Sequence, residues 1–200
     1  YMQTYIERDV RQLVNVRDLA TFQRFVRMCA MRTGQMLNLS ALAADCGVSH
    51  NTARGWLTVL EASYLAFTLP AWHRNLGKRL VKSPKVYLRD SGLLHALLNV
   101  RDEDDLLRQP WVGASFEGFV IEQALGLLGQ RGSGAEAFFL RTSDQKEIDL
   151  VLDFGATRWA IEVKLTASPG PGDLDRLDAV ADLIGAHRRV LISRTSEVVV

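Results

Sequence analysis

The sequence has no dominant charge. Its 200 residues include 24 Lys and Arg against 23 Asp and Glu, so the formal net charge is +1 with histidine neutral. A strongly basic chain would attract nucleic acid over its whole surface, and this balance means that any such site must be local. Hydrophobic residues make up 48% of the chain and charged residues 24%, which is typical of a globular protein that buries a core.

The chain also contains little cysteine. Cys29 and Cys46 are the only two, and they lack the spacing of metal ligands. We therefore interpret them as small buried residues in a reducing cytoplasm. The chain has no apolar run of roughly 18–20 residues that could cross a membrane, and it has no signal peptide. We expect a cytoplasmic protein without a membrane partner.

Motifs for two large classes of enzyme are missing. The chain contains no G-x-x-x-x-G-K-[ST] phosphate-binding loop, because Gly77-Lys78 is followed by Arg79. We therefore expect that it neither binds nor hydrolyses ATP in the P-loop manner. No Ser-His-Asp arrangement is indicated, and no pair of histidines has helical ligand spacing. The scattered histidines are His50, His73, His95 and His187.

The first part of the chain has a helical pattern. Apolar residues three and four apart predict helices over residues 1–33. Ser40 is the expected N-cap of a short helix over 41–46, and Ser49 that of a longer helix over about 50–63. Gly47 lies in the turn between them. Small or apolar residues occupy the positions that a helix-turn-helix requires.

Two expected strands, over residues 64–69 and 85–89, enclose a basic segment and predict a wing. In a DNA-binding interpretation, the start of the second helix enters the groove and the wing contacts phosphates. The alternative is that the winged helix contacts only protein, because this helix carries a single arginine and also Glu61. The groove candidates are His50, Asn51, Thr52 and Arg54, and the phosphate candidates are Lys78, Arg79 and Lys82.

An acidic connection over residues 101–110 indicates a domain boundary near 99–113. We expect a helical and winged helix-turn-helix domain over residues 1–98 and a second domain over 113–200. The second domain should have the order α-β-β-β-α-β, which makes the whole chain α/β, or more strictly α+β. Its expected elements are a helix over 115–128, strands over 137–141, 147–152 and 159–165, a helix over 173–184 and a strand over 189–193.

Residues 147–165 predict a β-hairpin with a two-residue turn at Gly155-Ala156. Ile148, Leu150 and Leu152 should then share one face of the first strand. The same turn places Asp149 directly opposite Glu162. Like charges in that position destabilise a sheet, so a positive group should lie nearby. Either Lys164 or a divalent cation could supply it. The alternative is that these charges are simply solvated.

Glu117, Asp149, Glu162 and Lys164, in this order of elements, resemble the PD-(D/E)xK restriction-endonuclease-like superfamily. The chain as a whole is similar to the C-terminal region of a large family of prokaryotic AAA-type ATPases. In that family an ATPase core precedes a winged helix and a nuclease-like domain. The runs that carry this resemblance are residues 5–10, 41–49, 60–65, 73–79, 83–87 and 116–120.

The resemblance implies a fragment of such an ATPase, with the ATPase core absent, and a site for phosphodiester hydrolysis. The start at Tyr1 also leads us to expect a piece of a longer protein. Asp149 and Glu162 would bind Mg²⁺ or Mn²⁺, with Glu117 as a direct or water-mediated ligand. Lys164 would orient the attacking water or stabilise charge on the phosphate. Alternatively, Glu117 is a first-turn residue favoured by the helix dipole.

Two functions follow from these expectations. The first is a metal-dependent nuclease module that acts on DNA under the control of an ATPase. The second is a non-catalytic module that binds nucleic acid or protein with the same fold. The sequence leaves association into homo-oligomers open.

Overall fold

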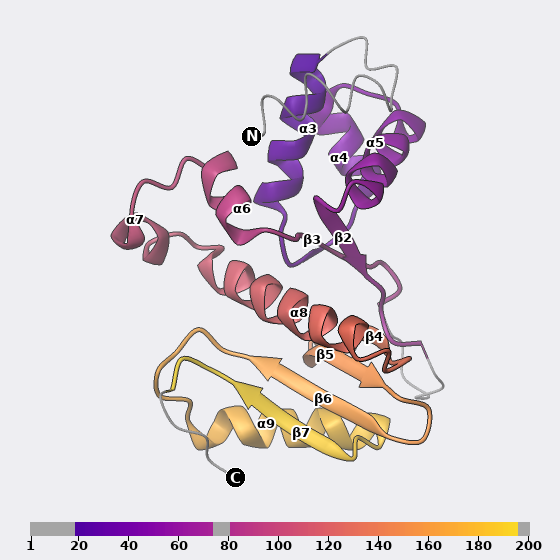
Figure 1. Cartoon of the computed structure of the whole chain (residues 1–200), viewed down its shortest axis with the longest axis vertical. Helices are drawn as coiled ribbons and strands as arrows, with labels where there is room; N and C mark the ends of the chain where they lie inside the picture. Colours follow the sequence, from indigo (N-terminus) through magenta and orange to yellow (C-terminus); the bar gives the residue numbers. More distant parts are fainter. Residues whose placement is uncertain (1–18, 74–80, 196–200) are drawn as a thin grey trace.

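The computed structural model of the chain describes residues 19–73 and 81–195, which form an α+β protein as predicted (Figure 1). The expected helices before residue 19 and the candidates Lys78 and Arg79 lie outside the described residues. In the parts of the chain that are described, no helix combines the length and apolar character needed to span a bilayer.

The N-terminal half packs three helices on a small antiparallel sheet of order β1-β3-β2. Edge-to-face contacts join the Trp56 ring to the rings of Phe22 and Phe25 in its core. The elements are α3 (Leu19–Met31), β1 (Gln35–Met36), α4 (Leu39–Cys46), α5 (His50–Ala62), β2 (Ala66–Leu69) and β3 (Lys85–Leu88).

The two helices predicted on either side of Gly47 are present, with one difference at the start of the first. Ser49 caps α5 through the Thr52 N–H at 3.1 Å, as expected. The cap of α4 is Asn38 rather than Ser40, because the Asn38 side chain accepts the Ala41 N–H at 3.0 Å and the helix begins at Leu39. Asn and Ser have similar cap preferences, so the sequence did not separate them.

Two short helices, α6 (Ser91–Leu97) and α7 (Glu103–Leu107), connect this half to the second one. The acidic segment that was expected to connect the two domains contains α7, which Asp102 caps through the Asp105 N–H. Aspartates at the start of a helix are stabilised by its dipole, which explains why an acidic run can begin one.

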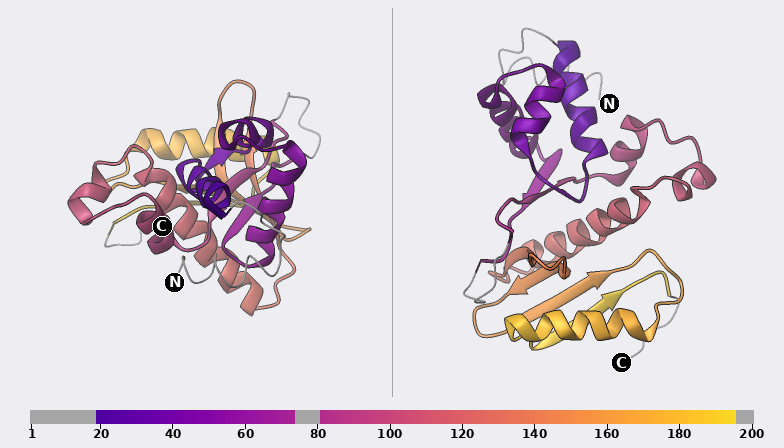
Figure 2. Two further views of the ribbon diagram at one scale, coloured as in Figure 1. Left: turned by 90° about the horizontal axis from the view of Figure 1, so that it is seen from above. Right: turned by 180° about the vertical axis from the view of Figure 1, so that it is seen from behind.

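The C-terminal half has the predicted order α-β-β-β-α-β around a sheet of order β4-β5-β6-β7. Its strands are antiparallel except for the β6–β7 pair. Helix α8 covers one face of this sheet and helix α9 covers the other face (Figure 2). The elements are α8 (Val112–Gln130), β4 (Glu136–Arg141), β5 (Glu147–Asp153), β6 (Arg158–Val163), α9 (Pro171–Ala181), a 3₁₀ turn (Asp182–Ile184) and β7 (Arg188–Ile192).

The β5–β6 hairpin has the predicted register. Asp153 pairs with Arg158, and Leu150 pairs with Ile161. Gly155 has a φ of +82°, which suits the tight turn.

A β-bulge on β5 overturns the predicted arrangement of faces. Phe138 pairs with Val151 but Leu140 pairs with Ile148, so two steps along β4 match three along β5. Ile148 therefore packs on the α9 side. Leu150 and Leu152 pack on the α8 side. The prediction that Ile148 shares their face was wrong, because alternation assumes an uninterrupted ladder.

The two halves share one layer of packing. Phe67 and Tyr87 from the first sheet lie in the same apolar cluster as Ile121 of α8 and Leu150 of β5. Downstream of β2, the Trp72 N–H donates to the Phe139 carbonyl of β4 at 2.7 Å. Strand β3 of the N-terminal half therefore also packs against the C-terminal half. The site described next lies where these two halves meet.

Candidate functional site

Carboxylates from α8, β5 and β6 gather where strand β3 meets helix α8. Glu117 comes from the second turn of α8 and Asp149 from the bulge of β5. Glu162 lies on β6, and Lys164 follows that strand. The alternative role of Glu117 as a first-turn residue does not hold, because α8 begins five residues earlier, at Val112.

Lys85, the first residue of β3, lies in the middle of these acids. Its side chain is only 3% exposed. Its Nζ is 2.8 Å from Glu117 Oε1, 2.5 Å from Glu147 Oε1 and 3.9 Å from Asp149 Oδ1. Burial alone would lower the pKa of Lys85, but the charges of these three carboxylates outweigh it and hold the pKa above its usual value. Lys85 is therefore a buried ammonium ion with three carboxylate neighbours.

Glu117 has a second donor from the same strand. The Tyr87 hydroxyl, which is fully buried, donates to Glu117 Oε1 at 2.5 Å. Burial and the charge of Glu117 raise the pKa of Tyr87, so the hydroxyl stays protonated and acts as a donor. One oxygen of Glu117 thus receives both an ammonium and a hydroxyl group.

Asp149 is held by the backbone of the neighbouring strand. Its Oδ2 accepts the Val163 N–H at 2.9 Å, just beyond the Leu150–Ile161 pair. Asp149 is 8% exposed, so the prediction of simply solvated charges does not apply to it. Burial first, and then the charges of Glu117 and Glu162, raise the pKa of Asp149 well above its usual value. The charge of Glu162 therefore acts on Asp149.

Lys164 pairs with Glu162, as the sequence suggested. Lys164 Nζ is 2.5 Å from Glu162 Oε1. The other oxygen, Oε2, is buried and has no hydrogen-bond partner among the described residues. Burial raises the pKa of Glu162, and the hydrogen bond and charge of Lys164 oppose that rise.

These side chains do not fit a divalent cation as they are placed. Within residues 19–73 and 81–195, no group of three acidic, histidine or cysteine side chains is arranged to hold a metal ion. Lys85 occupies the position between Glu117, Glu147 and Asp149. The sequence had suggested Lys164 or a metal ion as the positive group, and the structure adds Lys85.

Three residues of this site were missed by sequence reasoning: Lys85, Tyr87 and Glu147. A signal existed on β3 and α8. Polar groups recur at every second residue of β3 and at the position after it, and Glu117 and Glu122 are the only charged residues of α8. Arg89 completes the pattern, because its Nη1 is 2.7 Å from Glu122 Oε1 and 2.8 Å from Oε2. The sequence analysis had instead assigned the start of this strand, with Lys85, to a basic wing, so its contact with the carboxylates was not predicted.

Four of the nucleic-acid candidates, His50, Asn51, Thr52 and Arg54, lie at the start of α5. Asn51 and Arg54 are exposed. The Thr52 side chain is engaged in the helix cap, because its hydroxyl is hydrogen-bonded to Ser49 Oγ at 2.8 Å. His50 is half-buried, and Lys82 is exposed just before β3. The structure therefore leaves Asn51, Arg54 and Lys82 open to solvent.

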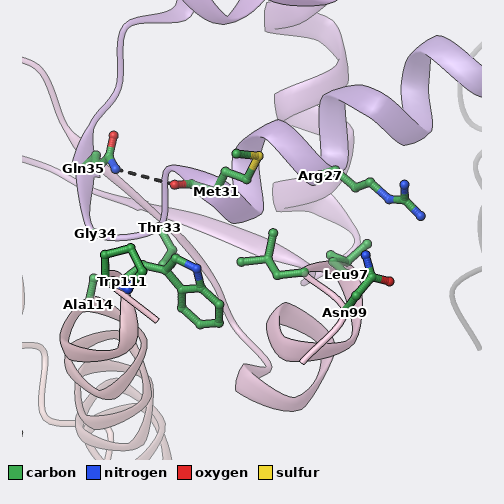
Figure 3. Close-up of a pocket in the computed structure, with 11 residues that line it drawn as sticks. Arg27, Met31, Thr33, Gly34, Gln35, Leu97, Asn99, Trp111 and Ala114 are labelled. Atoms are coloured by element: carbon green, nitrogen blue, oxygen red, sulfur yellow. Dashed lines mark hydrogen bonds between the residues drawn. The ribbon is translucent and has the colours of Figure 1, made fainter. Parts of the chain in front are cut away.

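A separate cavity of about 650 Å³ lies between α3, β1, the end of α6 and the start of α8. Met31, Leu97 and the indole of Trp111 line it, with Arg27 and Asn99 at one side (Figure 3). None of the carboxylates described above lines this cavity.

Comparison with known proteins matches both halves of the chain. A family model described as a domain of unknown function, DUF8612, matches residues 1–104. A second, also a domain of unknown function, DUF4143, matches residues 112–199. Uncharacterized proteins of Mycobacterium tuberculosis and Mycobacterium bovis are each 38% identical over 169 residues. That alignment covers 84% of this chain but 37% of each relative. No solved structure matches.

Proposed function

The chain belongs to the DUF8612 family of domains of unknown function, so its role must be proposed from the site itself. We propose that the chain is a non-catalytic, DNA-binding module in the C-terminal region of a prokaryotic AAA-type ATPase. The relatives extend well beyond the region that this chain spans, which leaves room for an ATPase core in them. The resemblance of the sequence to that ATPase family supports this placement.

The position of Lys85 carries the non-catalytic part of the proposal. Hydrolysis of a phosphodiester on this kind of scaffold requires a divalent cation that activates water and offsets charge on the phosphate. Here an ammonium group of the chain itself lies between Glu117 and Glu147. A second ammonium, that of Lys164, pairs with Glu162. The carboxylates that would bind the metal already have cationic partners.

The order α-β-β-β-α-β, with acids on α8, β5 and β6, supports a PD-(D/E)xK-like scaffold beneath this site. Fold does not fix activity, since one scaffold can keep its architecture while its site performs another task. We therefore assign the scaffold to the nuclease-like group and the function to binding.

The exposed start of α5 is the proposed DNA contact. In a helix-turn-helix the beginning of the second helix enters the major groove, and here it presents the side chains of Asn51 and Arg54 to solvent. Lys82 would contact the phosphate backbone. Because the basic groups are few, the affinity should be modest and should fall steeply with salt.

A metal-dependent nuclease is the second candidate, and one observation favours it. Four carboxylates, of Glu117, Glu147, Asp149 and Glu162, face the cations of Lys85, Arg141 and Lys164. One negative charge is not balanced, and Glu162 Oε2 has no hydrogen-bond partner among the described residues. A Mg²⁺ or Mn²⁺ ion bound beside Glu162 would balance that charge and give Glu162 Oε2 a partner.

One set of assays tests both candidates. Binding of labelled duplex DNA by the chain of residues 1–200 should weaken in Arg54→Ala and persist in Asp149→Asn. Arg101→Ala is the matched control, because that side chain is 79% exposed and lies outside the candidate surface. With Mg²⁺ or Mn²⁺, plasmid DNA should stay intact.

Cleavage that is lost in both Asp149→Asn and Lys164→Ala would establish the nuclease instead. Failure of the chain to bind DNA at low salt would overturn the DNA-binding proposal and favour a protein-contact role for the helix-turn-helix.

A further inference from the structure

The cavity between α3 and the start of α8 lies where the two halves of the molecule meet. Its volume of about 650 Å³ is within the range of roughly 300–1,000 Å³ that is usual for small-molecule sites. Arg27 of α3 and Gly34 just before β1 line it from the N-terminal half. Trp111 and Ala114, at the start of α8, line it from the C-terminal half. A molecule bound there would contact both halves.

The walls at the α8 end of the cavity are held in place by contacts within the protein. A Cβ added to Gly34 would lie 2.8 Å from Ala114 Cβ, so the backbone at Gly34 lies directly on the first turn of α8. The Gly34 N–H also donates to the Val86 carbonyl at 2.8 Å. The Trp111 indole packs against the His95 ring, with the two ring centroids 5.8 Å apart. These contacts form the site in advance, which lowers the cost of ordering it on binding.

The middle of the cavity suits a flat apolar group. The side chains of Met31, Leu97 and Trp111 line it (Figure 3). Met31 is 54% exposed although it is a large apolar residue, so a ligand that covered it would remove apolar surface from water. Indole rings and thioether groups both pack favourably against aromatic rings. An aromatic ring system is therefore the ligand group that this region would bind best.

Arg27 gives the cavity a positively charged end. Among the described residues it is the only charged side chain that lines the cavity, and no carboxylate lines it to pair with Arg27. Asn99, which follows α6 with a φ of +58°, lies at the same side as Arg27 (Figure 3). A guanidinium group and a side-chain amide both present N–H donors, which match the two oxygens of a carboxylate.

We propose that this cavity binds a small aromatic carboxylic acid. Its ring system lies among Met31, Leu97 and Trp111, and its carboxylate faces Arg27 and Asn99. A cationic ligand would be repelled by Arg27, and an uncharged one would leave the guanidinium without a counter-ion. The inference goes beyond the proposed function, because the cavity shares no residue with the DNA contact or with the carboxylate cluster.

Binding of 2-naphthoate to the chain of residues 1–200 tests the inference. The matched control compound is 2-naphthamide, which has the same ring system without the charge. In NMR titrations, 2-naphthoate should bind saturably with a Kd on the order of 1 mM or tighter. The indole signal of Trp111 and the amide signals of Gly34 and Ala114 should shift. The amide compound should bind about three- to tenfold more weakly, because it lacks the charged hydrogen bonds.

Two exposed residues on α3 provide a matched pair of variants. Arg27→Gln should weaken the binding of 2-naphthoate by about three- to tenfold and leave the binding of 2-naphthamide unchanged. Arg24→Gln is the control, because Arg24 is exposed three residues earlier on α3 and does not line the cavity. Asn99→Gly should also weaken the binding of 2-naphthoate, and glycine accepts the positive φ at this position.

Saturable binding that needs both the carboxylate and Arg27 would support the inference. It is overturned if 2-naphthoate does not saturate the site, if 2-naphthamide binds equally well, or if Arg27→Gln binds 2-naphthoate like Arg24→Gln. Shifts of the same NMR signals on raising the protein concentration without ligand would assign the cavity to contact with a second copy of the chain. That result would also overturn the inference.

Discussion

The coupling between Lys85 and Glu117 is the strongest energetic expectation that the structure supports. The pair is 2.8 Å apart, and the two side chains are 3% and 14% exposed. Removing one partner of a buried ion pair typically costs about 3–5 kcal/mol, because the other charge is left uncompensated. We therefore expect Lys85→Met to lower the free energy of unfolding by about that amount.

The corresponding change in Tm is large for a chain of 200 residues. At about 2–4 °C per kcal/mol, Lys85→Met should melt roughly 6–20 °C below the wild type. Lys82→Met, at an exposed position, should stay within about 0.5 kcal/mol of it. Urea unfolding followed by circular dichroism gives the free energies.

A double-mutant cycle then isolates the pair. Glu117→Gln alone should cost about 1.5–3 kcal/mol, because its hydrogen bonds lose a charged acceptor. The double variant should be less destabilised than the sum of the single variants, by about 1–3 kcal/mol, because it buries fewer unpaired charges. Additivity within about 0.5 kcal/mol would refute the energetic coupling between Lys85 and Glu117.

Three further predictions concern other contacts. Tyr87→Phe should cost about 1.5–3 kcal/mol in urea unfolding, since it removes a hydrogen bond to the charged Glu117. Gly34→Ala should lower the Tm, because Gly34 has φ +71° and an added Cβ would lie 2.8 Å from Ala114 Cβ; an unchanged Tm would contradict this close approach. Burial lowers the pKa of His95 below its usual 6.5, so the unfolded chain takes up the proton more readily, and stability should fall as the pH drops below about 6.5. His95→Gln should show a smaller fall over that range, and an identical pH profile would argue against the assignment.

Local features of the sequence determined much of the second half. Gly155 suits a tight turn, and the turn fixes the register of the β5–β6 hairpin. The order α-β-β-β-α-β followed from periodicity and from the loops between the elements. The pairing of Lys164 with Glu162 could also be predicted, because residues two apart on a strand share a face.

The β-bulge of β5 could not be predicted from periodicity and turn residues. A strict alternation of faces describes a regular ladder, and nothing in the run around Asp149 marks the extra residue that moves Ile148 to the α9 side. The cap of α4 shows the same limit on a smaller scale, because Asn38 and Ser40 are similarly suitable in sequence and only the structure shows that Asn38 accepts the Ala41 N–H.

The sequence by itself determined the hairpin register that brings Asp149, Glu162 and Lys164 to one end of the C-terminal sheet, because a tight turn and strand alternation are local patterns. Only the tertiary structure decided that Glu147 and Lys85 join them. Lys85 is 32 residues from Glu117 along the chain and belongs to the other sheet. A contact between separately formed units depends on how their surfaces pack, and no local periodicity encodes that packing.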